Sequence, residues 1–366
     1  MKPVNVAMIG VGSISGIYLQ NIHSLFRNEL RLVGVCDLVR ERAENAQRQY
    51  AVPKLYETMH DAFADPEVEV VLNLTRPYEH FDVSRAAILA GKHVYTEKPL
   101  GASFEEGTEL LRLAREKGVL CAGAPDTFLG AGIQQCRRLI DSGAIGAPVG
   151  AAGFMICRGH ETWHPDPAFY YQRGGGPMMD MGPYYVTALV NLLGRVKSVQ
   201  AVTKASFPTR LITSQPFAGT VVDVTVPTLY QGILEFESGA VGSLFTTFDV
   251  YYPFQARLEV YGSEGTLFVP DPNCFNGEIR LFRPGMKEPE VVAQRDFGFA
   301  DNSRGLGLAD FARALRGEQP DARADAQQIY HVLEILTSFE KASNARAAVD
   351  LATPYARRPP QDPLQR

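Results

Sequence analysis

The sequence has little of several features that define specialised classes of protein. It contains one tryptophan, and its five cysteines are odd in number and widely spaced, with no CxxC pair. That pattern excludes a disulfide scaffold and predicts reduced core cysteines in a cytoplasmic protein. No apolar run reaches the roughly 18 residues that a membrane span needs. The opening MKPVNVAMIG is too soon interrupted by glycine for a signal peptide, so we expect a protein that is not exported.

Positive charge is not in excess either. The chain has 36 Lys and Arg residues against 41 Asp and Glu residues, a net charge of −5, with no long basic run. We therefore expect no nucleic-acid or membrane partner, and a small molecule is the expected ligand. Hydrophobic residues at 45% and charged residues at 21% are typical of a globular protein. With about 150 residues per domain, 366 residues predict two domains.

The first third of the chain alternates short apolar runs with amphipathic stretches of helical period. This alternation is typical of an α/β fold with a doubly wound parallel sheet and crossover helices. In the helix expected at 103–118, Ser103 and Glu106 form a capping box and Gly118 ends the helix. The pattern predicts a dinucleotide-binding domain over residues 1–125. Its strands are expected at 4–10, 30–36, 68–74, 92–98 and 119–124.

Beyond residue 125 the rhythm changes and strands come to dominate. Two stretches are each expected to form an antiparallel hairpin, one turning at Ser238-Gly239 and one at 262–265. These features predict a second domain over residues 126–366. Its helices are expected at 130–142, before Gly194, at 305–316 and at 324–344.

A glycine-rich turn follows the first expected strand. In Gly10-Val11-Gly12-Ser13-Ile14-Ser15, Gly10 permits a tight turn and Gly12 lets the backbone approach a pyrophosphate. Ser13 and Ile14 lie at the start of the next helix, whose N–H groups and dipole favour an anion. The third glycine of the usual fingerprint is replaced by Ser15. We expect Gly10, Gly12, Ser13 and Ile14 to bind a dinucleotide.

The end of the second expected strand carries Asp37, where a carboxylate can accept hydrogen bonds from an adenosine ribose. The same charge repels a ribose phosphate, which favours NAD as the cofactor. Arg40 and Arg42 offset part of that repulsion, so NADP remains possible.

A lysine ends the strand expected at 92–98. In Glu97-Lys98-Pro99 the ammonium lies where ligands of open α/β sheets bind, and it can polarise a carbonyl or stabilise an alkoxide. Together with the glycine turn, Asp37 and the segment Thr75-Arg76-Pro77-Tyr78-Glu79-His80, this segment resembles the family of glucose–fructose oxidoreductase and inositol dehydrogenase, the Gfo/Idh/MocA-type oxidoreductases. The resemblance extends over essentially the whole chain.

The resemblance implies a Rossmann domain followed by a substrate-binding α/β domain with a large, mostly antiparallel open sheet. In such proteins the face of that sheet often makes subunit contacts, so a homodimer or homotetramer is expected. The resemblance also implies that Lys98 is catalytic. The further cofactor-binding residues that it implies are Thr75, Pro77, His80 and Glu97.

The segment 174–184, GGGPMMDMGPY, resembles the second-domain signature of the same family. Its Asp180 and Tyr184 match positions that hold aspartate and histidine in many relatives, and tyrosine in the glucose–fructose oxidoreductase branch. If the stretch is helical, a spacing of four places both side chains on one face. A phenol with a pKa of about 10 is a poor base unless a cation lowers that pKa, and Lys98 is the candidate cation.

The segment His160-Glu161-Thr162-Trp163-His164 spells HExxH, the form of a zinc motif. Such a motif needs a helix and a third ligand, and here Gly159 and the prolines that follow disfavour the helix, so we expect no metal. Trp163 and His164 are instead expected to line a substrate pocket, and His164 is a second candidate for the acid/base residue. Further candidates for binding sugar hydroxyls are Asp126, Arg158 and Arg173.

These residues predict an NAD-dependent oxidoreductase that moves a hydride between the nicotinamide and a secondary alcohol or ketone of a sugar, polyol or sugar derivative. Two alternatives share the same residues. One is a redox-neutral glycoside hydrolase or lyase that uses NAD transiently, and the other is a catalytically silent NAD-binding regulator.

Overall fold

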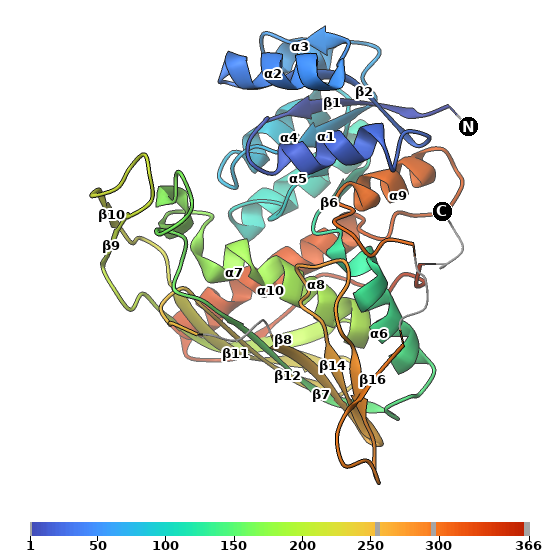
Figure 1. The fold of residues 1–366 in the computed structure, drawn as a ribbon, viewed down its shortest axis with the longest axis vertical. Coiled ribbons are helices and arrows are strands. Elements are labelled where there is room, and N and C mark those ends of the chain that lie inside the picture. The colour runs from blue at the N-terminus through green and yellow to red at the C-terminus, as the bar shows by residue number, and fades with distance from the viewer. Residues whose placement is uncertain (1, 253–256, 294–297, 362–366) are drawn as a thin grey trace. The chain divides into compact units, whose positions relative to one another are not determined.

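The computed structural model describes residues 2–252, 257–293 and 298–361 (Figure 1). The chain divides into two compact units. The first holds the residues up to Asp126 together with Asn302–Leu333, and the second holds Thr127–Asp301 and the residues from Glu334 onward. The sequence places the first boundary within one residue of this division. It does not predict the return of residues 302–333, which were expected in the second domain and pack within the first unit.

The first unit contains a six-stranded parallel sheet in the order β3-β2-β1-β4-β5-β6. The predicted doubly wound sheet is confirmed. The order reverses direction between the neighbours β1 and β4, and in such sheets ligands bind beyond the carboxyl ends of the strands at this point. The strands are β1 (Val4–Ile9), β2 (Leu30–Cys36), β3 (Lys54–Leu55), β4 (Val70–Asn73), β5 (His93–Thr96) and β6 (Cys121–Gly123).

Crossover helices connect these strands. The helix predicted at 103–118 is confirmed, because Ser103 Oγ accepts the Glu106 N–H at 3.3 Å and Gly118 ends the helix in the left-handed region at φ 66°. The Glu106 carboxylate reaches one residue further back than a capping box requires, accepting the Ala102 N–H at 2.7 Å. The helices are α1 (Ser15–His23), α2 (Arg40–Tyr50), α3 (Met59–Ala64), α4 (His80–Leu89) and α5 (Phe104–Lys117).

Asp126 anchors the returning segment, which contains α9 (Leu306–Leu315) and the start of α10 (Ala326–Ala345). Its Oδ2 accepts the N–H groups of Gly305 and Gly307 at 2.8 and 3.1 Å, so the carboxylate caps α9. The side chain is 1% exposed. The expected role of Asp126 in binding sugar hydroxyls has no support in these contacts, because the buried carboxylate satisfies a helix terminus of its own unit.

The second unit contains a nine-stranded sheet in the order β16-β15-β14-β13-β7-β12-β11-β8-β17. Both predicted hairpins are confirmed, and of the neighbouring pairs in this sheet only β7 and β12 run parallel. A separate ribbon pairs β9 (Thr209–Leu211) with β10 (Val221–Asp223). The strands of the large sheet are β7 (Pro148–Ile156), β8 (Val196–Lys204), β11 (Leu229–Phe236), β12 (Val241–Thr247), β13 (Arg257–Gly262), β14 (Gly265–Val269), β15 (Arg280–Phe282), β16 (Glu290–Val291) and β17 (Val349–Asp350).

Helices of the second unit lie along one side of this sheet (Figure 1). They are α6 (Ala131–Asp141), α7 (Gly176–Asp180) and α8 (Gly182–Leu193), and every residue of α8 is buried. Two short 3₁₀ helices, Thr127–Leu129 and Ala168–Tyr171, flank them in sequence. In β11 buried residues alternate with exposed ones such as Ile233, which is 47% exposed, so the strand has one packed face and one outward face.

The cysteines partly follow the expectation of a reduced core. None is joined in a disulfide in the part of the chain that the structure describes. Cys36, Cys121 and Cys136 are buried, but Cys157 is only half-buried and Cys274 is exposed, so the core prediction is wrong for Cys274. Across residues 2–252, 257–293 and 298–361, no helix combines the length and the hydropathy that crossing a membrane requires.

The Asp126 cap predicts a pH-dependent stability. Burial raises the pKa of this carboxyl to about 6, so the folded state binds the proton more tightly than the unfolded state. The contribution of Asp126 to stability is therefore greatest below the usual aspartate range and is lost as the pH rises towards 6. Asp126→Asn keeps an oxygen acceptor without the charge. Its free energy of unfolding should exceed that of the wild type at pH 7 by roughly 3 kcal/mol, and the two free energies should converge at about pH 3.

Denaturant unfolding of both proteins across this pH range measures the difference. A difference that does not change with pH would show that the pKa of Asp126 is the same in the folded and unfolded states, contrary to the prediction.

Candidate functional site

The glycine turn joins β1 to α1. Gly10 has φ 94°, and a Cβ there would lie 2.8 Å from both the carbonyl carbon and the carbonyl oxygen of Leu74, so only glycine fits. A Cβ on Gly12 would meet nothing within 4 Å. Gly10 is thus required by the packing of its own loop, whereas Gly12 leaves open space beside the backbone.

The start of α1 suits an anion. Its N-cap residue Ile14 makes no side-chain capping bond, and the first turn contains no acidic residue. Ser15, in place of the third glycine, is 3% exposed and donates its hydroxyl to the Gly12 carbonyl at 2.7 Å. With the open space beside Gly12, this uncapped helix terminus fits the pyrophosphate of a dinucleotide.

Asp37 lies beside the same turn. Its Oδ2 accepts the Val11 N–H at 2.6 Å and its Oδ1 accepts the Val39 N–H at 2.7 Å. A carboxylate has about four acceptor positions, so both oxygens retain capacity for ribose hydroxyls. Leu38, the next residue, is 96% exposed and offers an apolar surface on which the adenine ring of a dinucleotide could pack. The carboxylate therefore shapes the loop and also fits its predicted role in cofactor binding.

Asn73 organises the loop that follows β4, a role that was missed in reading the sequence. The side chain is fully buried, and its Oδ1 accepts the Thr75 N–H at 3.2 Å and the Thr75 hydroxyl at 2.6 Å. Its Nδ2 donates to the His80 carbonyl at 3.0 Å. A polar residue inside the apolar run VVLNL was the available signal. Thr75 and Pro77, both expected near the cofactor, are half-buried in this loop.

His80 connects two loops of the first unit. Its Nδ1 lies 2.7 Å from the Pro99 carbonyl oxygen and its Nε2 lies 3.0 Å from the Thr75 carbonyl oxygen. Burial lowers the pKa of His80, although the two carbonyls favour the protonated form. At 1% exposure the ring holds the loops after β4 and β5 together. Direct contact between His80 and a cofactor stays a prediction.

Glu97 fixes the backbone at Lys98. Its Oε1 accepts the Tyr18 hydroxyl at 2.8 Å, and its Oε2 accepts the Lys98 N–H at 3.0 Å. Burial, with the charge of Glu97, raises the pKa of Tyr18 well above its usual value, which keeps the phenol a donor. Glu97 is thus a buried support, whereas Lys98 itself is half-buried.

In the second unit, the predicted pair Asp180 and Tyr184 lies across a break between two helices. Asp180 is the last residue of α7 and Tyr184 lies in the first turn of α8, with Met181 between them at φ −104°. The Asp180 side chain is 14% exposed and Tyr184 is 7% exposed. The single helix that would place both on one face is therefore interrupted.

The HExxH segment forms a turn and not an α-helix. His160 Nε2 lies 3.0 Å from Asp180 Oδ2, a contact that sequence reasoning missed because it considered His160 only as a zinc ligand. His164 Nδ1 accepts the Asp166 N–H at 3.0 Å, and burial lowers the pKa of His164. A neutral His164 then carries its proton on Nε2, which leaves neither ring nitrogen able to accept a proton from substrate.

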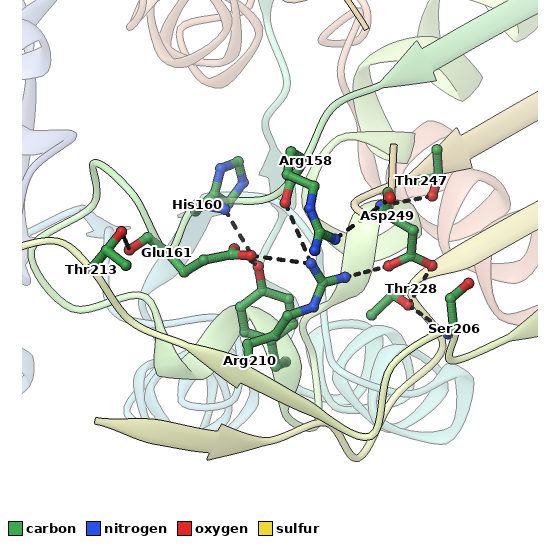
Figure 2. Close-up of polar contacts among 10 residues, drawn as sticks. Arg158, His160, Glu161, Ser206, Arg210, Thr213, Thr228, Thr247 and Asp249 are labelled. Atoms are coloured by element: carbon green, nitrogen blue, oxygen red, sulfur yellow. Dashed lines mark hydrogen bonds and ion pairs between the residues drawn. The ribbon is translucent and has the colours of Figure 1, made fainter. Parts of the chain in front are cut away.

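A buried ion-pair cluster holds the HExxH turn (Figure 2). Arg210, 3% exposed, lies between the carboxylates of Glu161 and Asp249, with its Nη1 3.1 Å from Glu161 Oε1 and its Nη2 paired with Asp249 Oδ1. The Tyr171 hydroxyl donates to Glu161 Oε2, and the Arg210 guanidinium lies over the Tyr171 ring. Burial and Glu161 raise the pKa of Tyr171. This compensated charge determines where the turn lies.

The other expected substrate residues belong to the second unit. The Arg158 guanidinium lies 4.8 Å from the Phe207 ring centroid and 5.2 Å from that of Tyr251. Trp163 is 61% exposed, and Arg173 is exposed as well. The exposed face of Trp163 suits the stacking of an apolar sugar face, whereas nothing in these contacts assigns a ligand to Arg158 or Arg173. In the described part of the chain, no group of three or more His, Cys, Asp or Glu side chains could hold a metal ion.

Comparison with known proteins identifies matches for both units. Residues 4–124 match the model of an oxidoreductase family with an NAD-binding Rossmann fold, and residues 133–268 match the GFO/IDH/MocA C-terminal domain. D-xylose dehydrogenase of Paenarthrobacter nicotinovorans is 30% identical over 287 residues, which cover 71% of this chain and 72% of that protein. The NAD⁺-dependent scyllo-inositol 2-dehydrogenase of Bacillus subtilis is 28% identical over 266 residues, 73% of each chain.

Solved structures agree on the fold. Levoglucosan dehydrogenase in complex with NADH and L-sorbose superposes with a TM-score of 0.83 at 20% identity, covering 96% of this chain and all of that one. The predicted fold class, with a parallel Rossmann sheet and a large, mostly antiparallel second sheet, is therefore confirmed.

The two glycines of the turn should respond differently to substitution. Gly12→Val places a side chain in open space, so the protein should fold normally while losing at least about tenfold in affinity for NADH, because the branched chain occupies the space for the pyrophosphate. Gly10→Ala should lower the thermal unfolding temperature, because its Cβ meets the Leu74 backbone. Calorimetric titration with NADH and thermal unfolding measure the two effects. Unchanged NADH affinity in Gly12→Val would remove Gly12 from the cofactor site.

Proposed function

Because the chain belongs to the oxidoreductase family defined by an NAD-binding Rossmann domain and a GFO/IDH/MocA C-terminal domain, we propose that it is a dehydrogenase of a sugar or polyol that uses NAD. The observation that carries this proposal is the combination, in one chain, of an anion-accepting glycine turn and a strand-end lysine whose backbone is fixed by Glu97. The related D-xylose and inositol dehydrogenases support a polyhydroxylated substrate.

The first unit supplies the cofactor half of the proposed reaction. When bound, NAD⁺ would supply the hydride acceptor at its nicotinamide. The turn at Gly12 and the uncapped start of α1 bind the pyrophosphate, and Asp37 accepts hydrogen bonds from the adenosine ribose. Arg40, the nearby candidate to pair with a ribose phosphate, is engaged by Glu44 and Glu57, and this supports NAD over NADP.

The remaining chemistry concerns the hydroxyl that is oxidised. We assign Lys98 to stabilise the negative charge that develops on the substrate oxygen as its proton leaves. For the proton itself the second unit offers Tyr184 and the pair formed by His160 and Asp180. Trp163 supplies an exposed aromatic face for the apolar side of a sugar ring.

Buried and exposed cysteines without disulfides support a cytoplasmic location, which we include in the proposal. We also propose that the protein is a homodimer or homotetramer. Apolar side chains on the outward face of the large sheet, Val202, Ile233 and Val241 among them, support this assembly, and the molar mass in solution tests it.

A panel of aldoses, anhydrosugars, inositols and their keto forms, followed by NADH absorbance, tests the activity. At least one member should produce or consume NADH with the wild type. Lys98→Ala should lower kcat for that compound by about 100 to 1000-fold with little change in NADH affinity, since the ammonium acts on charge in the transition state. Lys117→Ala, at an exposed lysine of α5, is the matched control and should keep full activity.

Silence of the wild type across the panel, with NADH bound, would support a nucleotide-sensing regulator. Release of aglycone from a glycoside without net NADH would support the redox-neutral hydrolase.

Cofactor choice should depend on the charge of Asp37. Asp37→Asn keeps an oxygen that can accept the Val11 or the Val39 N–H and removes the repulsion of a ribose phosphate. The ratio of kcat/KM for NAD to that for NADP should fall by about tenfold or more, because juxtaposed like charges cost several kcal/mol. Steady-state kinetics with both cofactors measure the ratio, and an unchanged ratio would mean that Asp37 serves only the loop.

A further inference from the structure

We propose that His160 is the catalytic base of the dehydrogenase, with Asp180 as the carboxylate that orients it. The inference rests on the proposed function and deepens it. It replaces Tyr184 and His164, which the sequence nominated for proton transfer, with a histidine from the HExxH turn.

The first observation is the pairing itself. His160 Nε2 lies 3.0 Å from Asp180 Oδ2, and the two side chains are 12% and 14% exposed. A neutral imidazole has one N–H, and the carboxylate, which only accepts, draws that proton to Nε2. The lone pair of the ring is then on Nδ1. A histidine whose tautomer and orientation are set by an aspartate is the arrangement that general bases use in catalytic triads.

The second observation is that Nδ1 is a buried atom without a hydrogen-bond partner within residues 2–252, 257–293 and 298–361. Buried polar atoms are nearly always paired, so this orphaned acceptor calls for a partner that the described residues do not supply. A substrate hydroxyl supplies the missing donor. His164 differs in this respect, because the Asp166 N–H already occupies its Nδ1.

The third observation is how rigidly His160 is held. Its ring packs against Tyr170, Phe248 and Trp163, with centroid distances of 4.1, 4.7 and 5.1 Å. The neighbouring Glu161 is fixed by Arg210, and a Cβ on Gly159 would collide with the Tyr171 hydroxyl at 2.2 Å. The turn can therefore take only a narrow range of positions, which a base requires.

The substrate O–H bond breaks and its proton passes to Nδ1 of His160. The carbinol C–H bond breaks with both electrons, which leave as hydride to NAD⁺, the oxidant, and the carbon–oxygen bond becomes a carbonyl. The imidazolium, stabilised by Asp180, then releases its proton to solvent.

Kinetics of His160→Gln, with the compound that the wild type oxidises, test the assignment. Glutamine retains an N–H donor for Asp180 but has no basic nitrogen, so kcat should fall by about 100-fold or more while NADH affinity is unchanged. His60→Gln, at an exposed histidine of α3, is the matched control. The double variant His160→Gln/Asp180→Asn should lose little more than His160→Gln alone, because the pair acts as a unit. Activity of His160→Gln within about threefold of the wild type, with a large loss in Tyr184→Phe, would overturn the assignment in favour of Tyr184.

Nitrogen-15 NMR of the histidine rings measures the tautomer of His160 in the wild-type protein. This measurement does not depend on catalytic turnover. In its neutral form the His160 ring, identified by its absence from the His160→Gln spectrum, should carry its proton on Nε2. A proton on Nδ1 would overturn the proposal, since that nitrogen would have no lone pair to act as base. If the wild type oxidises no compound of the panel, the proposed dehydrogenase fails, and the tautomer still decides whether Asp180 orients His160 as inferred.

Discussion

The second unit depends on the compensation of one buried charge. Arg210 comes from the short β9–β10 ribbon, and a guanidinium that is only 3% exposed is tolerable because carboxylates from two other segments surround it. Glu161 belongs to the turn that carries His160, and Asp249 follows β12. Removing either carboxylate would leave the charge under-compensated, so the positions of the three segments are linked. Through this linkage the ion pair, whose Glu161 is the chain neighbour of His160, supports the turn from which His160 contacts Asp180.

In the first unit, side chains stabilise the loops near the proposed cofactor site by hydrogen bonding to backbone groups. Loops that follow parallel strands carry unpaired backbone groups, and here buried side chains satisfy them. Asn73 holds the loop after β4, His80 connects that loop to Pro99 after β5, and Glu97 accepts the Lys98 N–H. Asp37 does the same for the glycine turn. These hydrogen bonds hold the backbone in place next to Gly12 and at Lys98.

In both units, buried polar side chains stabilise the loops that surround the candidate functional residues. In both, residues that the sequence nominated for ligand binding turn out to bind the protein's own backbone, as Asp126 does at the start of α9 and His164 does at Asp166. Polar residues near a site are needed first to satisfy the loops that form it. A side chain with a nitrogen or oxygen that the described part of the chain leaves unsatisfied, such as His160, is then the better candidate for chemistry.

The sequence by itself determined the fold class, most of the long strands and helices, and NAD as the cofactor. Apolar periodicity, Gly10 to Ser15, Ser103 with Gly118, and the hairpin turns are local patterns whose physical causes lie within a few residues, and the strands and helices they predict are present. The tertiary structure alone decided the return of residues 302–333 to the first unit, the burial of Asp126, the burial of Arg210 between Glu161 and Asp249, and the approach of His160 to Asp180. The contacts of His160 with Asp180, of Arg210 and of Asp126 join residues from 20 to 181 positions apart, and those of the returning segment reach 314 positions. No local pattern encodes them, because they follow from which buried charges and backbone groups must be satisfied once the chain has packed.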